Sequence, residues 1–299
     1  MEPAYIFLAL LILIMYGTSI WSAGTEGFED QGSVILEDNN GIYDSVYAST
    51  YDNLWHSREQ IKYEEIAIQE MCLADRPKTD IRILDMCCGT SPHACFFVQQ
   101  SLDFIGADIS PDMLVKARET CPSAKFQETD MTQVHVFPPK SMSTCLLLTF
   151  SIYMFENPKI ILDNAYQWLK PDGWFVVHLV DPDNYDPIHD LSSPFAAFSL
   201  QKYQKERQTE STVFFDKFKY NGKLIKKEGE DNATYEETLT YYDPSENDGK
   251  KYRQNNHRWS MPSKERMIDI VKSSGFKFVE AQDLTKVGKE YQYLVFFSK

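Results

Sequence analysis

Short apolar runs alternate with helical stretches through the first 180 residues of the chain. The runs IRILDMCC, FIGADI, STCLLLTF and WFVVHLV begin at residues 81, 104, 143 and 174, and KFQETDM lies between the second and the third. Ser110 followed by Pro111 marks the start of one of the intervening helices. Runs that are apolar on both faces and separated by helices are typical of a parallel sheet covered on both sides. We therefore predict a doubly wound α/β domain here.

The pattern changes to antiparallel strands after Asp181. The segments TVFFDKFKY and KLIKK flank the pair Asn221-Gly222, which favours a hairpin turn. TYEETLTYY and KKYRQNNHRW follow, and we expect them to continue the meander around a turn at residues 247–249. A helix from Ser263 and two closing strands, FKFVEAQ and YQYLVFFS, return to the α/β pattern. These segments predict an antiparallel terminal strand pair and an inserted β cap over residues 181–262.

An uncharged apolar stretch opens the chain. Ala4 to Tyr16 has the sequence AYIFLALLILIMY, and no charged residue occurs from Pro3 to Thr25. Such a stretch can cross a bilayer once if residues 17–21 are included. A cleaved secretory signal and a buried amphiphilic segment are the alternatives, and the lack of flanking Lys or Arg leaves the orientation open. We expect residues 1–22 to be a membrane anchor, residues 23–41 a linker and residues 42–299 the folded domain.

The charge balance narrows the classes of ligand. The 299 residues include 30 Lys and Arg against 44 Asp and Glu, a formal net charge of −14. A polyphosphate would be repelled by such a surface, so we expect no nucleic acid partner. The six cysteines show neither the spaced pairs of a zinc site nor the density of a disulfide scaffold, which favours a reduced compartment without a metal. The sequon at Asn232 indicates a lumen, but such triplets often arise by chance.

Acidic residues lie at or near the ends of three successive runs. Asp85 precedes a tight turn that contains Gly89 and opens a helix, which brings backbone amides close to a polar ligand. Asp108 lies near the end of the next run, placed to accept hydrogen bonds from a ribose diol. Asp130 and Met131 end the third run, placed to flank an adenine ring. The spacing predicts a nucleoside-binding site at the carboxyl edge of the sheet.

These segments resemble the motifs of class I S-adenosylmethionine-dependent methyltransferases of the small-molecule type. ILDMCCGTS resembles the family's first motif, FIGADISPDML its second, TDM its third, and WLKPDGWFVV the segment along its fifth strand. The resemblance covers about Tyr43 to Lys299 apart from the inserted meander, and it implies a Rossmann-like seven-stranded sheet. It also implies that S-adenosyl-L-methionine is the cofactor and that the residues around it are Asp85, Cys87, Gly89, Asp108, Ile109, Asp130 and Met131. The family usually has glycine at positions 87 and 91, where this chain has Cys87 and Ser91.

Two further cofactor contacts and three acceptor contacts are candidates. The resemblance to the family implies that Tyr51 corresponds to an aromatic residue that lies over the cofactor. It also implies that Arg58 corresponds to an arginine that binds the methionine carboxylate of the cofactor in glycine-methylating relatives. The alternative is that the tyrosines form a packed helical stripe and that Arg58 is a surface charge. Methyl transfer needs a base only where the acceptor must lose a proton, and the candidates are Tyr153, His178 and His257. The alternative for His178 is a structural role as a buried residue with local hydrogen bonds. The alternative for His257 is that it lies at an exposed strand end.

We predict an enzyme that transfers a methyl group to a small-molecule acceptor, with N-, O- or C-methylation left open. A non-catalytic S-adenosylmethionine-binding or partner-binding module is the alternative from another class. A dinucleotide oxidoreductase is disfavoured, because the loop has one glycine where GxGxxG needs three. Since S-adenosylmethionine is made in the cytosol, we expect a membrane-anchored protein with a cytosolic catalytic domain, not a secreted or lumenal one. We also expect the cap to contact the acceptor through His257 and Trp259.

Overall fold

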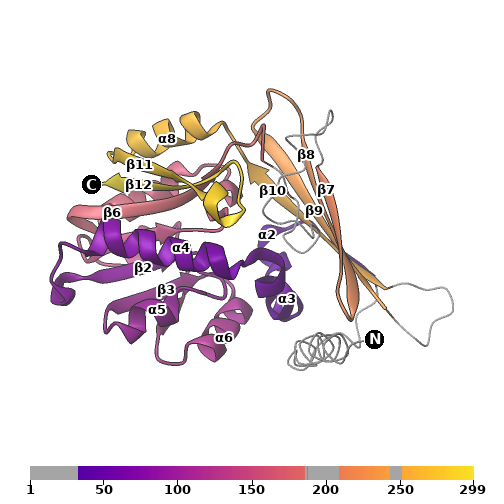
Figure 1. The fold of residues 1–299 in the computed structure, drawn as a ribbon, viewed down its shortest axis with the longest axis horizontal. Helices are drawn as coiled ribbons and strands as arrows, with labels where there is room; N and C mark the ends of the chain where they lie inside the picture. The colour runs from indigo at the N-terminus through magenta and orange to yellow at the C-terminus, as the bar shows by residue number, and fades with distance from the viewer. Residues whose placement is uncertain (1–32, 186, 188–208, 243–250) are drawn as a thin grey trace, which may run out of the picture. The chain divides into compact units, whose positions relative to one another are not determined.

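The computed structural model describes residues 33–185, 187, 209–242 and 251–299, which are coloured in Figure 1. The predicted anchor at residues 1–22 and the predicted turn at residues 247–249 lie outside the described residues. Within the described ranges, no helix has the length and apolar character needed to span a membrane. All the elements below belong to one compact unit that runs from Gly32 to Lys299.

The central sheet confirms the predicted Rossmann-like α/β class. Among the described residues it has seven strands in the order β11-β12-β6-β5-β2-β3-β4. Strand β12 runs antiparallel to both of its neighbours, and the other neighbouring pairs are parallel. The strands are β2 (Arg82–Met86), β3 (Asp103–Asp108), β4 (Lys125–Glu128), β5 (Met142–Leu147), β6 (Leu169–Val180), β11 (Lys277–Asp283) and β12 (Gln292–Ser298). The carboxyl ends of β2, β3 and β5 meet at one edge, where open α/β sheets bind ligands.

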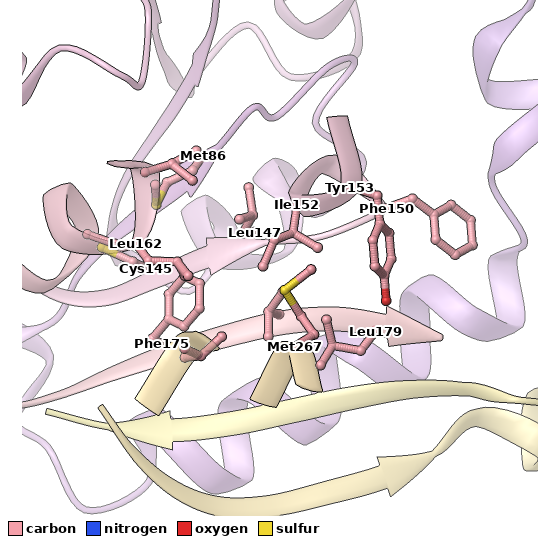
Figure 2. Close-up of a cluster of buried hydrophobic side chains, with 14 of the residues drawn as sticks. Met86, Cys145, Leu147, Phe150, Ile152, Tyr153, Leu162, Phe175, Leu179 and Met267 are labelled. Atoms are coloured by element: carbon pink, nitrogen blue, oxygen red, sulfur yellow. The ribbon is translucent and has the colours of Figure 1, made fainter. Parts of the chain in front are cut away.

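Helices cover both faces of this sheet. They are α4 (Arg58–Ile68), α5 (Ala94–Gln99), α6 (Pro111–Thr120), α7 (Lys159–Trp168) and α8 (Lys264–Ser273). Two further helices, α2 (Asn39–Ile42) and α3 (Ser45–Trp55), pack in a separate cluster with Tyr220 and Leu239. Leu84 of β2 packs in a cluster with side chains of α7 and α8, whereas Ile83 packs in a cluster with side chains of α4 and α5. Figure 2 shows part of the first cluster, where Leu162 of α7 lies near Cys145 and Phe175 of the sheet. Because successive strand side chains point to opposite faces, a sheet covered on both sides needs continuous apolar runs.

The cap is a second sheet with the order β1-β10-β9-β8-β7, five strands in the described part of the chain. Its strands are β1 (Val34–Leu36), β7 (Glu210–Phe214), β8 (Phe218–Lys226), β9 (Asn232–Tyr241) and β10 (Tyr252–Ser260). Strand β1 pairs parallel with β10, and the other pairs are antiparallel. In Figure 1, α2 and α3 lie between the central sheet and the cap strands. Strand β1 falls inside the range expected as a linker, so this range contributes an edge strand instead.

The hairpin turn predicted at Asn221-Gly222 is wrong. Both residues lie inside β8, and the turn between β7 and β8 falls at residues 215–217. A Cβ atom at Gly222 would lie 2.3 Å from the hydroxyl of Tyr235 and 3.0 Å from that of Tyr220. Glycine occupies this position because two tyrosine side chains approach the backbone closely, which only a residue without a side chain permits.

Candidate functional site

The loop after β2 has a left-handed backbone at three positions. The φ angles are 54° at Cys87, 54° at Gly89 and 49° at Ser91. Glycine adopts this conformation freely, whereas another residue type costs about 1 to 2 kcal/mol. The N–H of Cys88 donates to the carbonyl of Ala107 at 3.0 Å, which ties the loop to β3. Cys87 and Ser91 therefore keep the backbone conformation that suits glycine, with strain at both positions.

Asp108 ends β3 beside this loop. One carboxylate oxygen accepts a hydrogen bond from the N–H of Gly89 at 2.8 Å, and the other accepts one from the N–H of Ser110 at 2.9 Å. Burial raises the pKa of Asp108, and the hydrogen bonds from the Ser110 and Gly89 amides oppose that rise. A carboxylate offers about four acceptor sites, so Asp108 keeps capacity for a ligand hydroxyl.

A cavity of about 400 Å³, called here the cofactor cavity, opens beside Gly89 and Asp108. Seven of the nine predicted cofactor residues line it: Tyr51, Cys87, Gly89, Asp108, Ile109, Asp130 and Met131. The further lining residues are Asp38, Tyr43, Met113, Thr129, Thr132, Ser151, Met154 and Phe155. Tyr43 belongs to the same aromatic segment as Tyr51, a signal that could have assigned it to the cofactor. Asp38 carries no such signal, because it lies in the expected linker.

Helix α3 and the residues before it cover the cofactor cavity. The Ser110 hydroxyl donates to the Tyr43 carbonyl at 2.6 Å, and the Thr90 hydroxyl donates to the Asp52 carboxylate at 2.5 Å. The ring centroids of Tyr43 and Tyr51 lie 6.2 Å apart, and both rings line the cavity. The cover is therefore tied at two points to the loops that follow β2 and β3.

Asp85 lies beneath the loop and is absent from the lining of the cofactor cavity. Its carboxylate accepts a hydrogen bond from the Ser91 hydroxyl at 3.0 Å, and only 3% of the residue is exposed. Burial raises the pKa of Asp85 to about 6, against the opposing effects of His93 and the Ser91 hydrogen bond. Asp85 thus contacts the loop from below through Ser91, and its predicted place around the cofactor stays a prediction.

A larger cavity of about 580 Å³, called here the acceptor cavity, is lined by residues of α3, α4, β6 and β9. Its lining includes Thr90 of the loop after β2, which is called the cofactor loop below. The Trp55 ring centroid lies 5.9 Å from that of Phe150 and 5.4 Å from that of Tyr235, and all three rings line this cavity. Arg58 is exposed, lines the acceptor cavity instead of the cofactor cavity, and forms no ion pair within the described ranges.

His178 lines the acceptor cavity from β6. The residue is 1% exposed, and neither ring nitrogen has a hydrogen-bond partner in the described part of the chain. Its ring stacks on Phe150 with the centroids 4.7 Å apart. Burial lowers the pKa of His178, assisted by the charge of Lys289, and the charge of Glu64 and the polar side chain of Gln292 oppose this only in part. A neutral imidazole with an open nitrogen can accept a proton, so the geometry keeps His178 as a candidate base.

Tyr153 is buried and lines neither of these two cavities. Its hydroxyl accepts a hydrogen bond from the N–H of Val180 at 2.8 Å, and Figure 2 shows the side chain extending toward β6. Val180 is two residues beyond His178 on the same strand. The structure therefore assigns Tyr153 to the support of this strand end and does not bring it to the acceptor.

His257 and Trp259 also line neither of the two cavities, and their contacts with an acceptor stay a prediction. His257 is 1% exposed, and its Nε2 lies 2.6 Å from a carboxylate oxygen of Glu237. Trp259 is 3% exposed and stacks on Tyr235 with the ring centroids 5.1 Å apart. The physical reason is that this face of β10 packs inward against the cover of the cofactor cavity, as the contact of Tyr43 and His257 shows.

Residues 83–173 match the sequence profile of a family described as "Methyltransferase domain". A malonyl-[acyl-carrier protein] O-methyltransferase of Halalkalibacterium halodurans is 23% identical over 154 residues, 49% of this chain and 56% of the relative. A dTDP-3-amino-3,4,6-trideoxy-alpha-D-glucopyranose N,N-dimethyltransferase of Streptomyces venezuelae is 30% identical over 91 residues, 30% of this chain and 38% of the relative. The chain thus matches about half or less of the length of these curated relatives.

Solved structures match nearly the whole chain. The CcbJ methyltransferase of Streptomyces caelestis has a TM-score of 0.61 and 14% identity, over 85% of this chain and 96% of that protein. CalS10, an amino pentose methyltransferase of Micromonospora echinaspora solved with bound S-adenosylmethionine, has a TM-score of 0.59 and 14% identity, over 92% and 99%. At this identity the likeness concerns the fold. Together with the profile match over residues 83–173, it confirms the resemblance to class I methyltransferases.

Proposed function

We propose that this chain, whose residues 83–173 match the profile of a methyltransferase domain, transfers a methyl group from S-adenosyl-L-methionine to a small-molecule acceptor. The observation that carries the proposal is the cofactor cavity, which gathers residues from the loop after β2 and from the ends of β3 and β4.

The residues of the cofactor cavity fit an adenosine-bearing cation. Asp108 holds carboxylate oxygens toward a ribose diol, and Asp130 with Met131 provides a polar and an apolar side for a purine. Three carboxylates, at Asp38, Asp108 and Asp130, line the cavity and favour a positively charged ligand. When bound, S-adenosylmethionine supplies an electrophilic methyl group on a positively charged sulfur. The protein then has to align the acceptor with that group and exclude water.

We assign the acceptor to the larger cavity, because it reaches Thr90 of the cofactor loop and contains His178. An acceptor that enters as a protonated amine or a hydroxyl must lose one proton, and the open imidazole nitrogen of His178 can take it. The rings of Trp55, Phe150 and Tyr235 provide apolar surface against which a small molecule can be oriented. Arg58 provides a cation for a carboxylate of the cofactor or the acceptor at the same cavity.

Two parts of the proposal concern the whole chain. The apolar composition of residues 1–22 supports a single membrane anchor. The cytosolic synthesis of the cofactor supports a catalytic domain that faces the cytosol. Fractionation of cells that express the tagged chain, followed by protease protection, tests both parts. Full recovery in the soluble fraction would contradict the anchor, and protection of the domain inside sealed vesicles would contradict the cytosolic orientation.

The cofactor part of the proposal is tested with Asp108→Ala. Loss of a charged acceptor for the ribose hydroxyls should weaken S-adenosylmethionine binding by about 1.5 to 3 kcal/mol, roughly ten- to a hundredfold. The matched control is Asp103→Ala at the opposite end of β3, which should bind normally. Calorimetric titration of both folded variants measures the effect. Equal affinity in the two variants would remove Asp108 from the site, and no binding by the unaltered chain would refute the proposed function.

The catalytic part is tested with His178→Gln, which removes the imidazole and keeps a polar side chain. Labelled S-adenosylmethionine is incubated with lipid, quinone and amine pools, and single-turnover transfer is then measured on the acceptor found. Loss of the base should lower the rate by about a hundredfold or more with unchanged cofactor affinity. The control is His135→Gln, an exposed histidine away from both cavities. Cofactor binding without transfer to any pool would favour the non-catalytic binding module.

A further inference from the structure

A buried carboxylate joins the cap sheet to the cover of the cofactor cavity. One oxygen of Glu237, on β9, accepts a hydrogen bond from the Tyr47 hydroxyl at 2.5 Å and lies 2.6 Å from Nε2 of His257. The other oxygen accepts a hydrogen bond from the Tyr220 hydroxyl at 2.8 Å. The Glu237 side chain is 0% exposed. Burial works to raise the pKa of Glu237, but the charge of His257 and the hydrogen bonds outweigh it and lower the pKa, so the group is ionised.

Tyr47 is the point at which this network reaches both cavities. Its ring centroid lies 5.6 Å from that of Tyr43 and 5.7 Å from that of Tyr51, the two tyrosines that line the cofactor cavity. The hydroxyl of Tyr47 also accepts a hydrogen bond from the indole N–H of Trp55 at 2.8 Å, and Trp55 lines the acceptor cavity. Tyr47 therefore contacts side chains that line both cavities.

The cap carries a second polar tie to the same segment. Arg253 of β10 is 2% exposed, and its guanidinium donates to the Asp44 carboxylate at 2.8 Å and to the Ile42 carbonyl at 2.8 Å. Residues 253, 255 and 257 are successive inward positions of β10, and all three are buried polar residues. Apolar side chains would hold the cap and this segment together at a lower desolvation cost than buried polar side chains. A buried polar contact of this kind instead fixes one orientation of the partners.

From this geometry we propose that Glu237 is a positioning residue for the cofactor site: through Tyr47 it holds Tyr43 and Tyr51 over the cofactor cavity. The inference rests on the proposed function, because it concerns the cofactor of that reaction. It gives the inserted cap a role in cofactor binding, in addition to its contribution of Tyr235 to the acceptor cavity. Gly222 supports the arrangement, since its missing side chain leaves room for the Tyr220 and Tyr235 hydroxyls beside Glu237.

The test compares Glu237→Gln with Glu236→Gln, which removes the same charge from the neighbouring, partly exposed position of β9. S-adenosylhomocysteine, the demethylated cofactor, is titrated calorimetrically into the full chain. We expect about tenfold weaker binding for Glu237→Gln and a change below about twofold for Glu236→Gln. Thermal unfolding is measured with and without S-adenosylhomocysteine. A purely structural role would lower both melting temperatures equally, whereas a positioning role reduces the ligand-induced increase.

The second variant is Tyr47→Phe, which removes one hydroxyl and keeps the ring. It should weaken cofactor binding in the same direction, and the double variant should be no weaker than Glu237→Gln alone, because both act through one contact. If Glu237→Gln does not fold, Tyr47→Phe decides the matter by its own affinity. Normal affinity in Tyr47→Phe, or additive effects in the pair, would overturn the inference. Failure of the unaltered chain to bind S-adenosylhomocysteine would instead refute the proposed function.

Discussion

At the scale of single residues, the cofactor loop holds side chains in a backbone conformation that favours glycine. We expect Cys87→Gly to leave the free energy of unfolding unchanged or to raise it by about 1 kcal/mol. The substitution relieves the strain of a φ of 54°, while the greater freedom of glycine in the unfolded chain offsets part of the gain. Urea denaturation of the two proteins measures the difference.

The matched control for Cys87→Gly is Cys145→Gly in β5. Cys145 is fully buried and is not among the positive-φ residues, so its loss opens a cavity and adds backbone freedom. We expect that variant to lose about 2 kcal/mol or more. A similar loss in both variants would show that the Cys87 side chain contributes packing that exceeds the strain.

At the scale of elements, a buried ion pair joins α4 to the residue before α5. Nε2 of His93 lies 3.1 Å from a carboxylate oxygen of Glu64, and both side chains are at most 3% exposed. Burial alone would lower the pKa of His93, but the hydrogen bond to Glu64, the nearby Glu65 carboxylate and the charges of Glu64 and Asp85 raise it to about 10. The pair ties the second half of α4 to the residue that precedes α5.

The raised pKa of His93 predicts a pH dependence of stability. The contribution of protonated His93 is fully present below about pH 6.5, the pKa of an unfolded histidine, and is lost as the pH rises toward 10. We expect the free energy of unfolding to fall by about 3 kcal/mol over this range. In His93→Gln most of that fall should disappear, which urea titrations at a series of pH values would show. An equal fall in both proteins would place the titrating group elsewhere.

At the scale of the whole molecule, the segment before α3 belongs to the folded unit. Val34–Leu36 pairs with Arg253–Asn255 of the cap, and Asp38 lines the cofactor cavity. We therefore expect a chain that starts at residue 33 to bind S-adenosylmethionine like the full chain. A chain that starts at residue 42 should bind about tenfold more weakly and melt at a lower temperature, because it lacks the edge strand and Asp38. Calorimetry and thermal unfolding of the two fragments decide this, and equal affinities would make the segment dispensable.

Local signals in the sequence predicted that Gly89 and Asp108 lie together. Asp108 and Gly89 are separated by a helix and a strand, but the parallel α/β pattern already places strand ends at one edge, and the structure joins them by a hydrogen bond of 2.8 Å. Turn chemistry was less informative, because Gly222 is required by the close approach of the Tyr220 and Tyr235 hydroxyls and not by its own φ. Hydrophobic periodicity, helix capping and turn preferences all concern residues close together in the chain. They predict contacts between distant residues only where the fold is built from a regular repeated unit, such as strand–helix–strand.

The sequence by itself determined the α/β class, the order of the motifs and seven of the residues that line the cofactor cavity. Only the tertiary structure decided that His257 lies against Glu237, that Arg58 lines the acceptor cavity and that Val34–Leu36 joins the cap. The physical reason is that a strand or a helix follows from the pattern of adjacent residues. By contrast, the partner of a buried polar group depends on which surfaces meet, and Glu237 and Tyr47 are 190 residues apart in the chain.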